Sequence, residues 1–469
     1  MEKTWAISGV DLHVDLPGYR VRAGLEAALR EAVQAGRLVP GTRLPASRTL
    51  AVDLGIARNT VAEAYGQLVA EGWLSARQGS GTRVSEHAVA AGDRPAPAPT
   101  AAGRVRYDLR PGQPDVTLFP RSAWLAAARR ALTRAPYDAL GYGDPRGRIE
   151  LREALAGYLA RVRGVRATPD RIVICSGFVQ SLALLCATQR SGGARRLGVE
   201  AYGHTLHREV AAATGLAVMP IPVDAAGAAT HALAGVDAAV LTPAHQFPLG
   251  VPLAPERRRH AVEWARDGDR LLVEDDYDGE FRYDRQAVGA MQALAPEHIA
   301  YAGTASKSLA PGLRLSWLVV PARLLEAVVE AKRLADAGSG ALDQLTLAEL
   351  IAGGAYDRHI RRCRLEYQRR RARLVAALHR GVPGTHVAGV AAGLQALVEL
   401  PAGVSEDDAV AAARERGVAV EALAAYGATA QMHAPALVVG YGTPPQHAFS
   451  TAVARLCAAL ADISPASSR

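Results

Sequence analysis

Lysine is nearly absent from this 469-residue chain: Lys3, Lys307 and Lys332 are the only lysines among 54 basic residues, and the other 51 are arginines. Cysteine is scarce too, and the four cysteines lie far apart without C-x-x-C spacing, which excludes a zinc-binding pattern and a disulfide framework. No apolar run approaches the ~18–20 residues that cross a bilayer, and the first residues lack the regions of a secretory signal peptide. We therefore expect a cytoplasmic protein with reduced cysteines, no metal site and no membrane contact.

The composition is that of a folded protein, with 49% hydrophobic and 21% charged residues. At typical domain sizes of roughly 100–200 residues, the length predicts two to four compact units. The net charge of +8 suggests a nucleic-acid partner, but residues 1–85 hold ten basic and eight acidic side chains. Because bulk charge does not locate a DNA-binding region here, sequence patterns must.

One stretch divides the chain into parts of different composition. Residues 88–103 (AVAAGDRPAPAPTAAG) alternate proline with alanine and contain almost no large apolar side chains, which is typical of a semi-extended linker. We predict a domain over 1–85, a linker over 86–104 and a larger domain over 105–469.

The larger part alternates apolar, strand-like runs with helical stretches such as 150–162, a pattern that predicts an α/β sheet with crossover helices. The strand-like runs span residues 171–177, 237–243, 270–276 and 313–320.

The N-terminal part contains three helical segments, over residues 19–35, 47–55 and 58–72, in which apolar side chains recur at helical spacing. The tight turn between the second and third segments predicts a helix-turn-helix. Two short strands around the Gly-Ser-Gly sequence at 79–81 follow, and this arrangement is typical of a wing.

Residues 44–84 resemble the winged helix-turn-helix of GntR-type transcription regulators over its whole length. The resemblance implies that residues at the helix starts and at the wing tip contact operator DNA. These residues are Arg48, Arg58, Asn59, Thr60, Gly79, Ser80 and Gly81. Their chemistry agrees, since helix N-termini favour phosphate, arginine can pair with guanine and asparagine with adenine. Ala57 departs from the family, which commonly has a serine or threonine there to cap the recognition helix.

Lys307 lies among small hydroxyl residues at 304–308 (TASKS), and Arg314 follows seven positions later. This combination suits a phosphorylated aldehyde such as pyridoxal phosphate (PLP), because the amine can form a Schiff base while hydroxyls and a guanidinium hold the phosphate. Upstream, Asp275 and Tyr277 end an apolar strand, where a carboxylate can pair with the pyridine nitrogen and a phenol with the 3-oxygen. Lys332 has no comparable partner chemistry in its sequence context.

Together these segments resemble the aminotransferase-like α/β domain of fold-type I PLP enzymes, which has a mixed sheet with crossover helices and a smaller α+β subdomain. The order of winged helix, linker and this domain resembles the MocR/GabR subfamily of GntR-type regulators. Further motifs occur in the same order at 142–147 (YGDPRG), 176–180 (SGFVQ), 245–250 (HQFPLG) and 274–283 (EDDYDGEFRY).

The resemblance implies a role for each matching residue. Lys307 would form the Schiff base with PLP, Asp275 would pair with the pyridine nitrogen and Tyr277 with the 3-oxygen. The phosphate would be held by Thr304, Ser306, Arg314, the amides of Phe178 and Val179, and the partner subunit's Tyr142. That last role implies a homodimer.

Three positions depart from aminotransferases on the substrate side. Phe247 stands where those enzymes have an asparagine, and His204 occupies the ring-stacking position, where an imidazole stacks less extensively than a phenol. Ala434 stands where an arginine clamps the substrate carboxylate, and His433 could replace that clamp only in part. Three alternatives stay open: a ligand without that carboxylate, a ligand held by another arginine such as Arg208, or the cofactor itself as the ligand.

These departures favour a PLP-binding transcription regulator in which the aminotransferase-like domain serves sensing rather than catalysis. The winged helix would bind operator DNA as a dimer, and the cofactor domain would sense an amine, an amino acid or PLP itself through Schiff-base exchange. Two alternatives stay open: a working aminotransferase with an incidental N-terminal extension, and a degenerate scaffold that never holds PLP.

Overall fold

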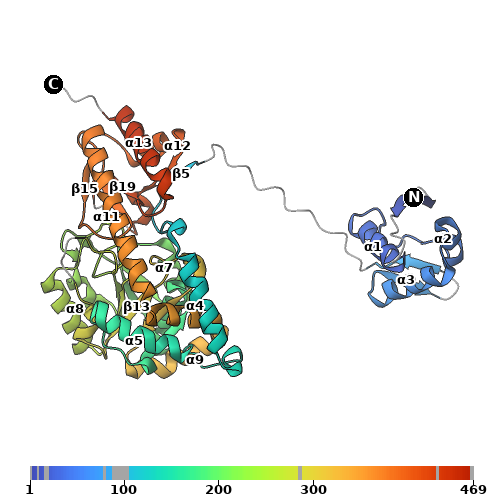
Figure 1. Ribbon diagram of the computed structural model, residues 1–469, viewed down its shortest axis with the longest axis horizontal. Helices are drawn as coiled ribbons and strands as arrows, with labels where there is room; N and C mark the ends of the chain where they lie inside the picture. Colours follow the sequence, from blue (N-terminus) through green and yellow to red (C-terminus); the bar gives the residue numbers. More distant parts are fainter. Residues whose placement is uncertain are drawn as a thin grey trace. The chain divides into compact units, whose positions relative to one another are not determined.

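The computed structural model describes residues 3–7, 10–14, 21–77, 81–86, 105–283, 288–428 and 433–464, with side chains from residue 21 onward. The chain divides into two compact units, Met1–Ala102 and Gly103–Arg469 (Figure 1). Within these ranges, no helix is long and apolar enough to cross a membrane, and no cluster of potential ligands is placed to hold a metal ion. All four cysteines are buried free thiols.

Three helices and a two-stranded wing form the first unit. Helices α1 (Val21–Gln34), α2 (Ser47–Leu54) and α3 (Arg58–Ala70) enclose a core of aliphatic side chains with Tyr65 at its edge. The wing strands β3 (Leu74–Arg77) and β4 (Gly81–Val84) pair antiparallel. The predicted winged helix-turn-helix is therefore confirmed. A hairpin of β1 (Lys3–Ile7) and β2 (Val10–Val14), which the sequence did not predict, precedes it.

The turn between α2 and α3 depends on Gly55. This residue adopts a left-handed conformation with φ 63°, which glycine reaches without the steric cost of a Cβ atom. Its amide and that of Ile56 donate to carbonyls in the last turn of α2. Helix α3 begins directly after Ala57, so Arg58 and Asn59 stand exposed at its first turn.

Ala57 is the N-cap of α3, and its backbone is extended, with φ −67° and ψ 138°, but its side chain offers no hydrogen bond to the first helical amides. An Ala57→Ser substitution should supply that bond and stabilise α3 by about 1 kcal/mol. We expect slower amide hydrogen exchange across α3 in the full chain. Ala62→Ser, at an exposed position inside the same helix, should not slow exchange, because serine is a weaker helix former than alanine. Equal exchange in the wild type and Ala57→Ser would contradict the prediction.

The second unit is built on a seven-stranded mixed sheet. Its strand order is β6 (Ile172–Cys175), β14 (Ser316–Val319), β13 (Ile299–Thr304), β12 (Leu271–Asp275), β11 (Ala238–Leu241), β7 (Arg196–Glu200) and β8 (Ala217–Ile221). Strand β14 runs antiparallel to both of its neighbours, and the other neighbouring pairs are parallel. The predicted mixed sheet is confirmed, and the parallel strands deliver their carboxyl ends to one edge.

Successive side chains of a strand point to opposite faces of the sheet. Both faces are apolar here, and helices cover both. In β6, Ile172 and Ile174 belong to one apolar cluster, while Val173 and Cys175 belong to another. The first cluster lies against helices α4 (Arg121–Arg134), α5 (Ile149–Arg163), α10 (Ala341–Ala352) and α11 (Ala355–Gly381). The second lies against α6 (Phe178–Ser191), α7 (Thr205–Ala213) and α9 (Ala322–Asp336). Helix α8 (Pro255–Asp267) packs on a third cluster.

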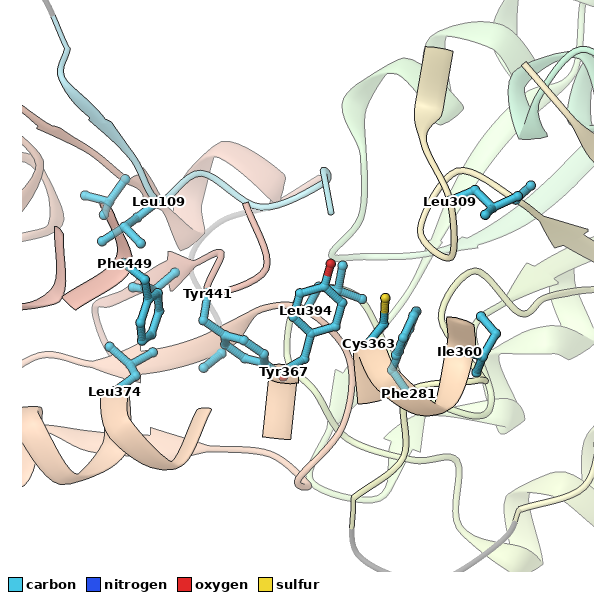
Figure 2. Packing of buried hydrophobic residues seen from close by; sticks show 14 of the residues in the cluster. Leu109, Phe281, Leu309, Ile360, Cys363, Tyr367, Leu374, Leu394, Tyr441 and Phe449 are labelled. Carbon is cyan, nitrogen blue, oxygen red and sulfur yellow. The ribbon is translucent and has the colours of Figure 1, made fainter. Parts of the chain in front are cut away.

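A smaller subdomain follows α11. It contains an antiparallel sheet in the order β15 (His386–Ala388), β16 (Ala396–Glu399), β19 (Ala436–Val439) and β18 (Glu421–Ala422), with helices α12 (Glu406–Glu415) and α13 (Gln446–Ile463). Strand β5 (Tyr107–Asp108) pairs with β17 (Val418–Ala419) at its side. One apolar cluster continues along α11 from Ile360 in the large subdomain to Leu374 beside Phe449 (Figure 2), so the two subdomains share a core.

Candidate functional site

The carboxyl ends of the parallel strands surround a cavity of about 220 Å³ in the second unit. Nine of the ten residues predicted to contact the cofactor line it: Phe178, Val179, His204, Asp275, Tyr277, Thr304, Ser306, Lys307 and Arg314. The tenth, Tyr142, is not among the lining residues, and its side chain is fully exposed.

Lys307 follows β13 and points into this cavity. Its Nζ donates to the backbone carbonyl of Gly112 at 2.6 Å. Burial lowers the pKa of the Lys307 amine, and the charges of Asp275 and Asp278 oppose the shift only in part. A lowered pKa enlarges the neutral fraction of the amine, which is the form that attacks an aldehyde.

Asp275 is the last residue of β12, and it is buried. Burial raises the pKa of its carboxyl well above the usual range, the neighbouring Asp276 adds to this, and Lys307 opposes it. A carboxyl in this state can hold a proton and share it with a basic ring nitrogen placed in the cavity.

Tyr277 lies two residues beyond Asp275 and is held by groups from other elements. Gln395 Nε2 donates to its hydroxyl at 2.9 Å, and His245 Nδ1 lies 3.2 Å from the same oxygen. His245 Nδ1 in turn lies 2.7 Å from Asp278 Oδ2. Burial and the charge of Asp278 raise the pKa of the phenol well above its usual value, so Tyr277 stays protonated and can donate a hydrogen bond.

A set of groups that could bind an anion lines the cavity around the N-terminus of α6. Gly177 is the N-cap, with φ 98°, and a Cβ on it would lie 2.6 Å from the guanidinium of Arg314. Arg314 donates to the carbonyl of Ser176, and the hydroxyl of Thr304 lies 2.9 Å from that of Ser306. Free helix amides, a guanidinium and two hydroxyls together suit a phosphate group.

Two histidines form an aromatic wall of the cavity. The ring of His204 stacks on Phe247 at a centroid distance of 4.3 Å and an interplanar angle of 15°, and His207 lies 4.8 Å from the ring of Phe178. Burial, aided by nearby cations, lowers the pKa of His204 to about 4 and that of His207 to about 3. Both rings are therefore neutral near pH 7 and can cover a flat ligand.

Neither of the two residues considered as substitutes for the carboxylate clamp is among the described residues that line the cavity. Ala434 is exposed, and His433 Nε2 lies 3.1 Å from the carbonyl of Val223, outside the lining. Arg208 donates to two backbone carbonyls and a threonine hydroxyl instead of reaching the cavity. Among the described lining residues, Arg314 is the only arginine. The Arg314 guanidinium lies beside Gly177 at the N-terminus of α6.

Five polar lining residues were not assigned a role from the sequence: Glu200, Tyr202, His207, Thr242 and Gln395. Burial raises the pKa of Glu200 to about 7, although hydrogen bonds from Thr242 and Gln246 oppose the shift. Gln395 precedes β16 and lies 118 residues from Tyr277, so no local pattern connects the two.

The predicted DNA contacts lie on the first unit. Arg48 is exposed at the start of α2, Arg58 and Asn59 are exposed at the start of α3, and Thr60 is half-buried. Gly81 begins β4 beside the guanidinium of Arg43. The other two wing-tip residues, Gly79 and Ser80, lie outside the described residues.

Each of the two units matches a known protein family. Residues 22–84 match the model for bacterial regulatory proteins of the gntR family, and residues 108–435 match the model for aminotransferase class I and II. The two matches define a DNA-binding transcriptional regulator that carries an aminotransferase-like domain.

Curated relatives have the same organisation. The chain is 32% identical over 430 residues to the pyridoxine biosynthesis transcriptional regulator PdxR of Corynebacterium glutamicum, covering 89% of this chain and 91% of that one. It is 32% identical over 393 residues to the probable rhizopine catabolism regulatory protein MocR of Rhizobium meliloti, covering 79% of each. The chain therefore belongs to the MocR/GabR subfamily of GntR-type helix-turn-helix regulators.

Among solved structures, a kynurenine aminotransferase from Pyrococcus horikoshii superimposes with a TM-score of 0.69 and 25% identity, covering 78% of this chain and 93% of that one. The predicted fold class of the larger domain is thus confirmed.

Proposed function

We propose that this regulator binds PLP at Lys307 and senses an amine-bearing metabolite or PLP itself. The observation that carries the proposal is the convergence in one cavity of a buried lysine, a buried carboxyl, a phenol and an anion-binding helix end. These residues fit the aldehyde, ring nitrogen, ring oxygen and phosphate of one molecule. When bound, PLP supplies an aldehyde that exchanges between primary amines.

Each group would then have a definite task. The Lys307 amine would attach the ligand, Asp275 would hold a proton at the ring nitrogen, and Tyr277 would donate to the ring oxygen. The amides at the start of α6 would hold the phosphate together with Arg314 and the hydroxyls of Thr304 and Ser306. The neutral ring of His204 would cover one face of the ligand.

Several features support sensing over turnover. Phe247 offers no polar contact, and the described cavity lining has no second guanidinium to orient the carboxylate of an α-amino acid. A relative named as a regulator of pyridoxine biosynthesis supports PLP itself as the effector.

We propose a homodimer with domains over 1–85 and 105–469 and a linker over 86–104. Apolar side chains stand exposed on α4 and on the turn η2 (Tyr137–Leu140), among them Leu125, Leu132, Tyr137 and Leu140. Tyr142 lies next to this surface in sequence, and its exposed phenol is available to a second copy. A second subunit on this surface would bury it and bring Tyr142 to the neighbouring cavity.

The proposal is tested with the purified full chain, its operator and PLP. We expect PLP to produce a visible absorption band and to change the affinity for operator DNA in fluorescence anisotropy. With an α-amino acid and an α-keto acid we expect at most one turnover per site, because the described lining has no second guanidinium to orient the substrate. Sustained transamination would favour the aminotransferase alternative, and the absence of any band would favour the scaffold.

A further inference from the structure

Lys332 has partners that its sequence context did not suggest. The side chain, on α9, is fully buried. Its Nζ donates to both carboxylate oxygens of Asp336 at 2.7 Å and to the hydroxyl of Ser339 at 3.1 Å. A buried ammonium is costly unless its donors are satisfied, and here three acceptors satisfy them.

The chain of contacts continues from Asp336 to the start of α6. Gln180 Nε2 donates to Asp336 Oδ2 at 2.8 Å, and Gln180 Oε1 accepts from the backbone amide of Ser176 at 2.7 Å. Gln180 is the third residue of α6, so its side chain folds back on the loop that leads into the helix. One amide side chain therefore joins the ion pair of α9 to the backbone of this loop.

The same loop belongs to the anion-binding end of the cavity. The carbonyl of Ser176 accepts from Arg314, and the Arg314 guanidinium packs directly over Gly177. Phe178 and Val179, whose amides begin α6, follow at once and line the cavity. The position of this loop therefore determines where the first amides of α6 and the guanidinium of Arg314 lie.

An ion pair that served only to stabilise α9 would not need this environment. Arg333 and Glu330 form such a pair on the same helix, at 2.7 Å, with more than half of each side chain exposed. Pairs of that kind contribute little to stability. Lys332 differs because it is buried and because its partner Asp336 extends the contact to another helix.

We infer that Lys332, acting through Asp336 and Gln180, is a positioning residue that holds the loop at Ser176 and Gly177 in place to bind the phosphate of the ligand. The inference rests on the proposed function, since it assumes a phosphorylated ligand in the cavity. Lys332 itself does not line the cavity.

Comparison of PLP with pyridoxal, which has the same ring and aldehyde but no phosphate, tests the inference. Both are titrated into the full chain and followed by visible absorption. Lys332→Met and Gln180→Met should each weaken PLP binding about tenfold, which is the effect of losing one hydrogen bond to the charged phosphate. Each should change pyridoxal binding by less than about twofold. Arg333→Met, the neighbouring control, should leave both affinities unchanged. Because Lys332 and Gln180 act through one chain of contacts, the double variant should lose little more than either single variant.

Equal weakening of PLP and pyridoxal binding in Gln180→Met would overturn the inference, as would unchanged PLP affinity in both variants. Gln180→Met leaves no unpaired buried charge, so it carries the test even if Lys332→Met does not fold. A wild-type chain that forms no band with either ligand would instead refute the proposed function.

Discussion

Replacing Lys307 with arginine will abolish covalent attachment of PLP. A guanidinium keeps the positive charge but stays protonated and cannot form a Schiff base. Burial lowers the pKa of the Lys307 amine, so the wild-type residue supplies the neutral form that arginine lacks. The expected result is the loss of the visible band, together with the loss of the mass increase after borohydride reduction.

The scarcity of lysine makes this experiment unambiguous. Only Lys3, Lys307 and Lys332 offer a side-chain amine, so a reduced adduct can be mapped to one of three peptides. Lys3→Arg serves as the control and should retain the adduct at position 307. An adduct that persists in Lys307→Arg, on either of the other lysines, would contradict the assignment.

Replacing Arg58 with alanine will reduce operator affinity by roughly tenfold or more, because an arginine paired with guanine contributes about 1–3 kcal/mol of discrimination. Arg58 stands exposed at the first turn of α3, where a recognition helix meets base edges. The affinity is measured by fluorescence anisotropy at several salt concentrations. Base readout predicts a loss that is larger for the operator than for unrelated DNA.

Arg37→Ala is the matched control for Arg58→Ala. It removes one positive charge from the same unit, at a position just after α1 where Arg37 pairs with Glu31. This variant should change operator affinity only slightly. Equal effects of the two substitutions would show that Arg58 contributes charge alone. An unchanged PLP absorption band in both variants would exclude damage to the second unit.

Short local patterns were sufficient to predict the groups that follow strand ends. Asp275 and Tyr277 come directly from β12, and Lys307 comes from the segment after β13, so the topology of a parallel sheet brings them together. The helix-turn-helix was also predictable from local sequence patterns. Its helices are amphipathic, and Gly55 marks the turn between them.

Groups supplied by distant elements could not be predicted. Gln395 reaches Tyr277 from the smaller subdomain, a contact that only tertiary packing creates. For Lys332, the spacing of four residues to Asp336 was visible in the sequence, but such pairs are usually exposed. Its burial depends on the packing of α9 against α6, which the sequence pattern does not contain.

The amine of Lys307 donates a hydrogen bond to the carbonyl of Gly112, a residue in the first segment of the second unit. Gly112 lies four residues after β5, the first strand described beyond the predicted linker, and β5 is paired with β17 of the smaller subdomain. A ligand that engages the Lys307 amine takes the donor away from this carbonyl. Gly112 lies only eight residues beyond the predicted linker. If Lys307 binds the ligand as proposed, occupancy of the cavity would therefore change a hydrogen bond to the first part of this domain.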